Sequence, residues 1–305
     1  MKKNTVIILT VSAAAVAALF LLFRFVACPV RGKDLPGGMA PSKGRPASNI
    51  AEQDAAIKRA EAVLEKDQDS PKAEAAYRSI ASAYAARGNF VKARDYYRKM
   101  LEKFPASSDM PGIQEAIEGL NVDMLLSPEP DGDSFSYVVK KGDNLVRISK
   151  RYGTTVELLT RSNGLKDSRI RAGMKLKVTK LKFSIAVDKS QNILTLKADG
   201  KVFKTYRVAT GKNSSTPTGA FTITNKIVDP PWYPPNGKMI PSGDPKNVLG
   251  SRWMGISKPT FGIHGTIDPQ SIGNSVTEGC VRMLNAEVEE LYDIVPQGTE
   301  VVIVD

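Results

Sequence analysis

A lone thiol and a lone imidazole lie close together near the C-terminal end of the chain. Cys280 follows Gly279, and His264, the one histidine among 305 residues, precedes Gly265; the other cysteine is Cys28. An imidazole can take the proton of a thiol and so create a nucleophilic thiolate. Neighbouring glycines leave backbone N–H groups accessible to a developing oxyanion. The alternative is a small buried cysteine beside a hydrogen-bonded core histidine, and spacing alone favours it.

The surrounding sequence changes this balance, because residues 183–305 resemble the L,D-transpeptidase catalytic domain of the YkuD family. The matching stretches run in order along the whole region: 209–211, 216–223, 231–232, 249–254, 264–266 and 279–283. The resemblance implies a mainly-β sandwich. It also implies that Cys280 is the nucleophile and His264 its base, a motif-based inference.

Further roles follow from the same resemblance. The Gly265 carbonyl would orient the imidazole, and the N–H groups of Gly279 and Cys280 would form the oxyanion hole. The thiolate would form a thioester with a tetrapeptide stem of peptidoglycan and release D-alanine. An amine of another stem, a lipoprotein lysine or water would then attack. Neither a metal nor a cofactor is required.

Residues around the thiol are candidates for substrate contact, namely Arg282, Thr277, Glu278 and Trp232. Arg282 would hold a substrate carboxylate or brace the site, with a structural ion pair as the alternative. Trp232 would stack on substrate or be buried. The family usually has histidine where this chain has Glu278, and a carboxylate there should disfavour the thiolate. Glu278 could point away, contact a substrate amine or mark a slowed enzyme.

Alternating and helical patterns predict the elements that position these residues. Strands are expected over 183–187, 202–208, 221–223 and 301–304, and a helix over 288–295 that Asn285 would cap. The proline-rich stretch 229–245 is expected to be irregular and to flank the substrate groove.

Residues 136–180 resemble a LysM domain, with strand-like patterns at 137–139 and 175–178 around two short helices. The resemblance implies binding of N-acetylglucosamine-containing glycan strands of peptidoglycan in a shallow groove between the two strand–helix loops. The candidate groove residues are Gly142, Asp143, Asn144, Asn163 and Gly164. The alternative is a small domain that only separates its neighbours.

Residues 50–126 show helical spacing and contain one stretch that resembles a tetratricopeptide repeat, with Tyr77 and Tyr84 on one helix, a turn at Gly88, and Tyr97 on the next. Flanking helices near 51–66 and 111–125 are expected to cover it, because one repeat cannot bury its own apolar face. A protein-docking surface and a plain spacer are equally favoured. Residues 127–135 form a linker.

The N-terminal segment predicts a membrane tether. Lys2 and Lys3 precede a mostly apolar run over 6–23, which Arg24 ends. Residues 1–28 are therefore interpreted as an uncleaved signal anchor, with a lipoprotein modified at Cys28 as the alternative. Residues 29–49 form a flexible linker. The remaining domains would then lie in the cell envelope, on the extracytoplasmic or periplasmic side.

The chain carries a net charge of +11 and has a pI near 9.5. No nucleic-acid-binding module is evident, and the basic residues are interpreted as spread along the chain. This charge suits an anionic envelope as well as it suits a generally solvated surface. The order of modules favours a peptidoglycan L,D-transpeptidase. The alternatives are an L,D-carboxypeptidase and a non-catalytic peptidoglycan-binding scaffold.

Overall fold

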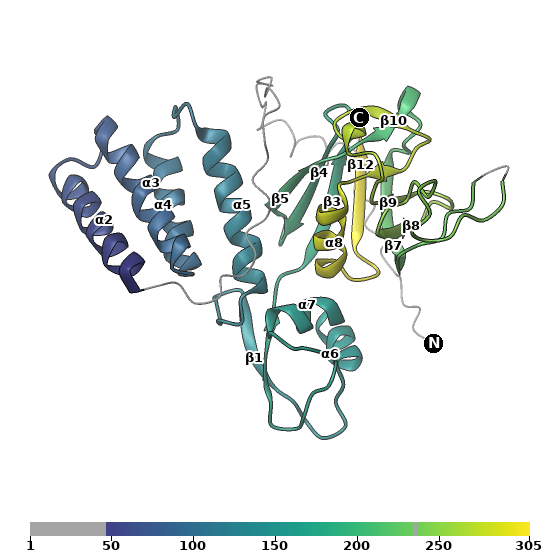
Figure 1. The fold of residues 1–305 in the computed structure, drawn as a ribbon, viewed down its shortest axis with the longest axis horizontal. Coiled ribbons are helices and arrows are strands. Elements are labelled where there is room, and N and C mark those ends of the chain that lie inside the picture. Colours follow the sequence, from purple (N-terminus) through teal and green to yellow (C-terminus); the bar gives the residue numbers. More distant parts are fainter. Residues whose placement is uncertain (1–46, 235–236) are drawn as a thin grey trace, which may run out of the picture. The chain divides into compact units, whose positions relative to one another are not determined.

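The structure is a computed structural model that describes residues 47–234 and 237–305 (Figure 1). Residues from Ala47 to Asp305 form one compact unit. The signal anchor predicted over 1–28, including Cys28, and nearly all of the linker over 29–49 lie outside the described residues. None of the described helices is long and apolar enough to cross a membrane.

Four helices form the first part of the unit, and each packs on the next: α2 (Ala47–Lys66), α3 (Pro71–Ala86), α4 (Phe90–Lys103) and α5 (Met110–Leu126). They share a core whose fully buried members include Ile80, Met100 and Ile113. The helices expected near 51–66 and 111–125 are present as α2 and α5. The tetratricopeptide interpretation of α3 and α4 stays a prediction.

Helix α5 has a second role that the sequence did not suggest, because it also covers an edge strand of the C-terminal sheet. The Asn121 Nδ2 group donates to the Phe203 carbonyl at 3.0 Å, and the Glu118 carboxylate accepts from the Thr205 N–H at 2.9 Å. Both partners lie on β5 (Lys201–Arg207). Side chains of α5 thus satisfy backbone groups that an edge strand would otherwise leave unpaired.

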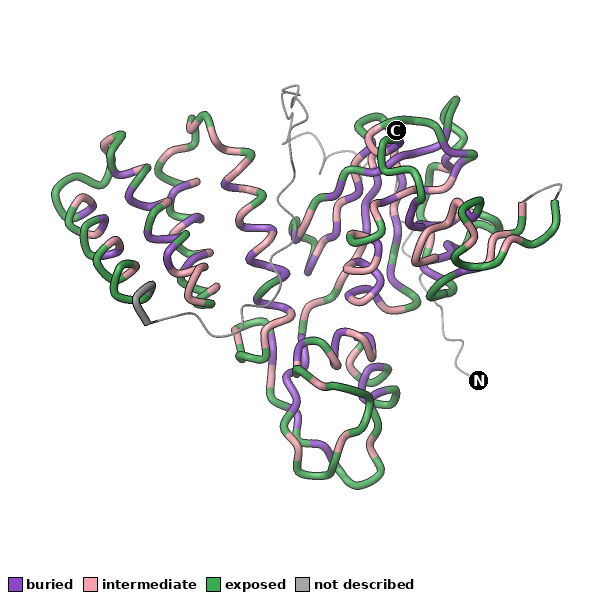
Figure 2. Tube along the Cα trace, viewed as in Figure 1, coloured by how far each residue is buried: buried purple, intermediate pink, exposed green. Residues whose placement is uncertain are grey.

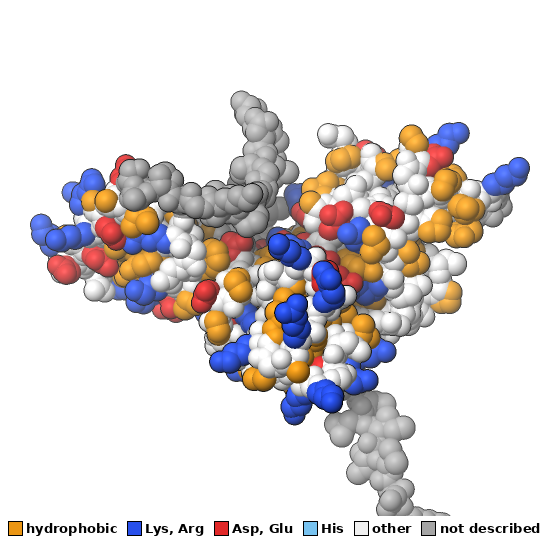
Figure 3. All heavy atoms as spheres, turned by 60° about the horizontal axis from the view of Figure 1, so that its bottom comes forward, with side chains coloured by type: hydrophobic (Ala, Val, Ile, Leu, Met, Phe, Trp, Pro, Cys, Tyr) orange, Lys and Arg blue, Asp and Glu red, His pale blue; other side chains and the backbone are white. Residues whose placement is uncertain are grey.

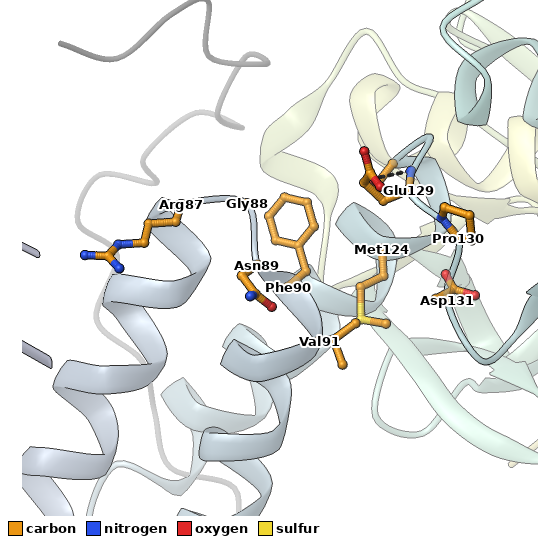
Figure 4. Close-up of a pocket in the computed structure, with 10 residues that line it drawn as sticks. Arg87, Gly88, Asn89, Phe90, Val91, Met124, Glu129, Pro130 and Asp131 are labelled. Carbon is orange, nitrogen blue, oxygen red and sulfur yellow. Dashed lines mark hydrogen bonds between the residues drawn. The ribbon is translucent and has the colours of Figure 1, made fainter. Parts of the chain in front are cut away.

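A hollow of about 290 Å³ lies where the turn between α3 and α4 meets the end of α5 (Figure 4). The exposed Val91 and the buried Met124 line it together with Glu129, Pro130 and Asp131 of the linker. Docking of a protein partner on these helices stays a prediction.

The LysM-like segment has the expected strand–helix–helix–strand order: β1 (Ser134–Val138), α6 (Leu145–Tyr152), α7 (Val156–Ser162) and β2 (Lys175–Thr179). The two strands pair antiparallel, with Tyr137 opposite Leu176. Leu145, Ile148 and Leu176 are almost completely buried between the strands and the helices.

The C-terminal segment is built on one eight-stranded sheet with the order β11-β9-β8-β7-β12-β3-β4-β5. Pairs β11–β9 and β12–β3 are parallel, and the others are antiparallel. Burial alternates along β4 and β12, and the buried side chains of the sheet form the core (Figure 2). The strands not yet bounded are β3 (Phe183–Asp188), β4 (Ile193–Ala198), β7 (Gly219–Val228), β8 (Arg252–Ile256), β9 (Gly262–His264), β11 (Val281–Arg282) and β12 (Glu300–Val304).

Shorter elements complete this segment: β6 (Thr210–Gly211), β10 (Ser275–Thr277), the 3-10 helices η1 (Lys212–Ser214) and η2 (Pro269–Ser271), and α8 (Asn285–Ile294). The strands predicted over 183–187, 202–208, 221–223 and 301–304 are confirmed as β3, β5, part of β7 and β12. The sequence patterns did not indicate β4, β8, β9 or the two-residue strands. Residues 229–234 and 237–245 are irregular, as expected, apart from one bridge between Trp232 and Ile240.

The predicted helix over 288–295 is present as α8, but its predicted cap is wrong. The N-cap residue is Leu284, and no side chain caps this helix end. The Asn285 side chain turns instead to the loop after β9: its Oδ1 atom accepts from the Thr266 N–H at 3.0 Å, and its Nδ2 group donates to the Thr266 carbonyl at 2.9 Å. Both ends of the Asn285 amide are therefore bonded to this loop and do not cap the helix.

We expect Asn121→Ala to lower the free energy of unfolding by about 1–3 kcal/mol, because it leaves the buried Phe203 carbonyl without its donor. Urea unfolding of the full chain measures this. Glu115→Ala on the exposed side of the same helix is the matched control, with a change of about 0.5 kcal/mol or less. Equal effects of the two substitutions would contradict the covering role of α5.

Candidate active site

The short parallel pair β9–β11 brings the predicted nucleophile and base onto one face of the sheet. Ile263 pairs with Val281, and His264 pairs with Arg282. Ile263 and Val281 are buried in the core. Because side chains alternate along a strand, His264, Arg282 and Cys280, which directly precedes β11, lie on the opposite face. The two predicted reactive residues therefore lie on the same face of the sheet.

The turn before the thiol requires glycine. Gly279 has a φ of +129°, and a Cβ atom there would lie 2.5 Å from Cε1 of Phe261 and 3.0 Å from the Ser215 carbonyl oxygen. The buried Thr277 closes the turn: its hydroxyl accepts from the Gly279 N–H at 3.2 Å and donates to the Cys280 carbonyl at 2.7 Å. Of the two predicted oxyanion donors, Gly279 thus already has an intramolecular partner.

The thiol of Cys280 is half-buried and points to a backbone carbonyl. Its Sγ atom lies 3.7 Å from the carbonyl oxygen of Thr260, a β-branched residue with a φ of +70°. Positive φ is unusual for such a residue and indicates a strained loop at this position. Burial raises the pKa of the Cys280 thiol, while a hydrogen bond with the Gly262 backbone and the charge of Arg282 oppose that rise in pKa.

His264 is 3% exposed and has a fixed tautomer. Its Nδ1 atom lies 2.7 Å from the Gly265 carbonyl oxygen, which can only accept, so Nδ1 carries the hydrogen and Nε2 keeps its lone pair. Burial lowers the pKa of His264 to about 4, and the charge of Arg282 adds to the effect. The imidazole is therefore neutral at pH 7. Within the described residues, no hydrogen bond joins it to the Cys280 thiol.

Two residues that the sequence interpretation did not assign to the site hold His264 in place. The indole of Trp253 stacks on the imidazole, with ring centroids 6.0 Å apart, and its Nε1–H donates to Asn225 at 3.2 Å. Asn285 fixes the loop after His264, and a Cβ atom on Gly265 would collide with its Oδ1 atom. The contacts of Asn285 join residues far apart in sequence, so local patterns could not indicate them and suggested a helix cap instead.

Arg282 lies between the site and the core and influences both reactive groups. Its Nη1 group donates to the Ser271 hydroxyl at 3.0 Å, and its buried Nε has no partner among the described residues. Burial lowers the pKa of Arg282, and the Asp268 carboxylate opposes this shift. An arginine stays charged nonetheless. These contacts fit the prediction that Arg282 braces the site.

Glu278 points away from the sulfur, which is the first of its three interpretations. Its side chain is 84% exposed and forms an ion pair with Lys212 at 2.7 Å. Its charge is not among the causes that shift the pKa of Cys280. Trp232 lies in the loop after β7, where it pairs with Ile240, and none of the described contacts joins it to Cys280 or His264.

In the LysM-like segment, two predicted glycan-binding side chains shape the loop between β1 and α6. The Asp143 carboxylate accepts from the Tyr137 hydroxyl at 2.6 Å, and Asn144 caps α6 by accepting from the Arg147 N–H at 2.8 Å. Gly142, with a φ of +86°, allows the loop to turn before them. The polar side chains of this loop are thus occupied by its own backbone and neighbours.

The loop between α7 and β2 shows the same arrangement. The Asn163 side chain donates to the carbonyls of Leu159 and Lys177, each at 2.9 Å, and accepts from the Lys177 N–H at 2.6 Å. It therefore clamps the end of α7 to β2. Gly164 follows it with a φ of +58°.

Comparison with known proteins agrees with this geometry. Residues 182–303 match the YkuD family, described as the L,D-transpeptidase catalytic domain, and residues 137–179 match the LysM domain. YkuD of Bacillus subtilis (strain 168), which carries L,D-transpeptidase in its name, is 37% identical over 175 residues, or 55% of this chain and 98% of that relative. The chain belongs to the YkuD family of L,D-transpeptidases.

Another relative named as an L,D-transpeptidase, YqjB of Bacillus subtilis, is 43% identical over 127 residues, which cover 40% of this chain and 70% of YqjB. A solved L,D-transpeptidase from Mycobacterium smegmatis overlays on 44% of this chain and 64% of its own, with a TM-score of 0.36 and 20% identity. A similarity at that level carries no functional argument. In this YkuD-family chain, the predicted reactive pair lies in the segment that the YkuD match covers, and the LysM match covers a separate segment.

We expect Arg282→Met to slow alkylation of Cys280 by iodoacetamide and to raise its half-maximal pH by about 0.5–1 unit, because the nearby positive charge lowers the thiol pKa. Mass spectrometry of the Cys280 peptide follows the reaction across pH. Glu278→Gln should leave the profile unchanged, and Arg282→Lys should restore most of it. A shift with Glu278→Gln but none with Arg282→Met would contradict this assignment.

Proposed function

We propose that this chain catalyses L,D-transpeptidation of peptidoglycan through a thioester on Cys280. The observation that carries the proposal is the arrangement of His264: buried, neutral at pH 7, and fixed by Gly265 on the same sheet face as the thiol. A neutral imidazole with a free Nε2 lone pair is the form that can accept a thiol proton. Membership of the YkuD family supplies the reaction class.

In the proposed first half-reaction, Nε2 of His264 takes the Cys280 proton and the sulfur attacks the carbonyl before the terminal D-alanine of a tetrapeptide stem. The N–H of Cys280 stabilises the oxyanion, and Gly279 joins if substrate displaces the Thr277 hydroxyl from its N–H. The C–N bond then breaks, D-alanine leaves with the proton from His264, and a thioester remains.

In the second half-reaction an acceptor amine gives its proton to His264 and attacks the thioester. A C–N bond forms, the C–S bond breaks, and the sulfur recovers a proton from His264. A stem-peptide amine would give a 3→3 cross-link, a lipoprotein lysine would give an anchored protein, and water would make the reaction an L,D-carboxypeptidase. Thr277, Glu278 and Trp232 remain proposed substrate contacts, with Arg282 bracing the thiol.

The resting geometry supports a substrate-triggered proton transfer. The thiol faces the Thr260 carbonyl, and burial raises its pKa while lowering that of His264. Both groups are therefore neutral before substrate binds, so the pair differs from a preformed thiolate–imidazolium pair. Binding of a stem peptide would turn the thiol from Thr260 towards Nε2. This neutral state would also protect the thiol from oxidation between turnovers.

The proposed location is the cell envelope outside the cytoplasmic membrane, where LysM and L,D-transpeptidase domains meet peptidoglycan. The basic and apolar segment over 1–28 is the proposed tether. A non-catalytic scaffold loses its main support, because the unusual Glu278 is directed to Lys212 and away from the sulfur.

Muropeptide analysis tests the proposal. We expect the full chain, incubated with disaccharide-tetrapeptide, to yield cross-linked dimers or tripeptide products, which also identify the acceptor. Cys280→Ala should give no product, and His264→Gln should slow the reaction by about 10² to 10⁴ because the proton acceptor is lost. Tyr233→Ala, at a strongly exposed site in the loop after β7, tests general sensitivity to substitution. Product formation by Cys280→Ala would refute the thioester route.

A further inference from the structure

The Lys and Arg residues are spread along the chain, as expected, but among the three segments that the structure describes the net positive charge is concentrated in the LysM domain. Residues 137–179 contain 11 Lys or Arg against 3 Asp or Glu, a net +8 of the chain's +11. Residues 50–126 carry 11 basic against 13 acidic side chains, and residues 183–305 carry 12 of each. In Figure 3 the Lys and Arg side chains gather over this domain.

Four of these cations surround the two loops that close the end of the β1–β2 pair. Lys140 and Lys141 lie in the loop after β1, while Arg171 lies in the loop before β2 and Lys175 is the first residue of β2. The loops are joined directly, because Lys175 pairs with Val138 and the backbone of the second loop bonds that of residue 139. We refer to Lys140, Lys141, Arg171 and Lys175 as the cationic rim.

The charges of the cationic rim are not compensated by carboxylates in the part of the chain that the structure describes. All four side chains are exposed, and none forms an ion pair with a carboxylate of the described residues. Other cations of the same domain do have such partners: Arg161 pairs with Asp293, Arg169 with Asp167, and the buried Lys177 with Asp131. A concentration of unpaired positive charge at one end of a domain attracts anions.

Lys140 and Lys141 of the rim directly precede the predicted groove residues 142–144, and Lys175 lies two positions before Lys177, whose backbone bonds Asn163. The Asp143 carboxylate, the Asn144 side-chain oxygen and both ends of the Asn163 amide are held in hydrogen bonds within the domain. The rim cations are therefore charged donors at these loops that the groove residues do not occupy. Neutral sugar hydroxyls do not need four positive charges, whereas carboxylates gain from them.

We propose that the cationic rim binds the carboxylates of stem peptides, so that the LysM domain prefers glycan strands bearing free stems over neutral glycans. The inference rests on the proposed function only in taking peptidoglycan as the polymer. Free stems carry the terminal carboxylate that transpeptidation consumes as donor. The domain would therefore place the enzyme on wall regions that still contain substrate, with tethering raising the local concentration of stems.

Co-sedimentation of the full chain carrying Cys280→Ala tests this without turnover. The matched probes are insoluble peptidoglycan and the same peptidoglycan after conversion of its carboxylates to neutral amides. We expect binding to native peptidoglycan to be at least about tenfold tighter, and the difference to shrink as salt rises from about 50 to 500 mM. Equal affinity for the two polymers would overturn the proposal.

Substitutions in the cationic rim then test whether the rim causes the preference for native peptidoglycan. Lys141→Gln/Arg171→Gln/Lys175→Gln should weaken binding to native peptidoglycan about tenfold, since each exposed pair contributes a factor of about two to five, and leave binding to the amidated polymer unchanged.

The control, Lys58→Gln/Lys66→Gln/Lys72→Gln, removes the same charge from exposed positions of α2 and α3 and should bind like the parent. Equal losses in both triple variants would show non-specific attraction and overturn the proposal. So would binding to phosphatidylglycerol vesicles as tight as to native peptidoglycan, because the rim would then recognise an anionic membrane surface. None of these binding results depends on catalysis by Cys280, so they stand apart from the outcome of the muropeptide test.

Discussion

The parallel pairing of β9 with β11 determines the chemistry of this chain. It places Ile263 and Val281 in the core and so forces His264 and Cys280 onto the opposite face, with Arg282 beside them. A shift of one residue in either strand would exchange these faces and separate the reactive pair. Such short strands cannot hold their register alone. The packed sheet on one side and the glycine turn before the thiol on the other must hold it.

Burial has opposite effects on the two reactive groups, and the consequence is a neutral resting pair. It raises the pKa of Cys280 and lowers that of His264 to about 4, because both charged forms lose hydration. Arg282 opposes the shift at the thiol and strengthens the shift at the imidazole. In the proposed mechanism the thiol proton would therefore pass to His264 only when a substrate brings compensating interactions, and the surrounding elements would supply orientation more than charge.

Local sequence predicted the LysM order and most of the long strands, because motifs and alternation are encoded by neighbouring residues. It failed where the deciding contact joins distant segments. Asn285 resembled a helix cap but holds a loop 19 residues earlier. Glu278 had three possible roles from sequence, and its ion pair with Lys212 joins residues far apart in the chain. Asn121 gave no sign that its helix would cover β5. Polar partners of this kind depend on tertiary packing, which periodicity does not report.

Intact-protein mass spectrometry after brief incubation with a disaccharide-tetrapeptide tests the covalent role of Cys280 most directly. A thioester would add the mass of the substrate minus D-alanine, the adduct would map to the peptide containing Cys280, and hydroxylamine would remove it. The adduct should be absent from Cys280→Ala. An unmodified protein under conditions in which cross-linked products accumulate, or an adduct that persists in Cys280→Ala, would contradict catalysis through this thiol.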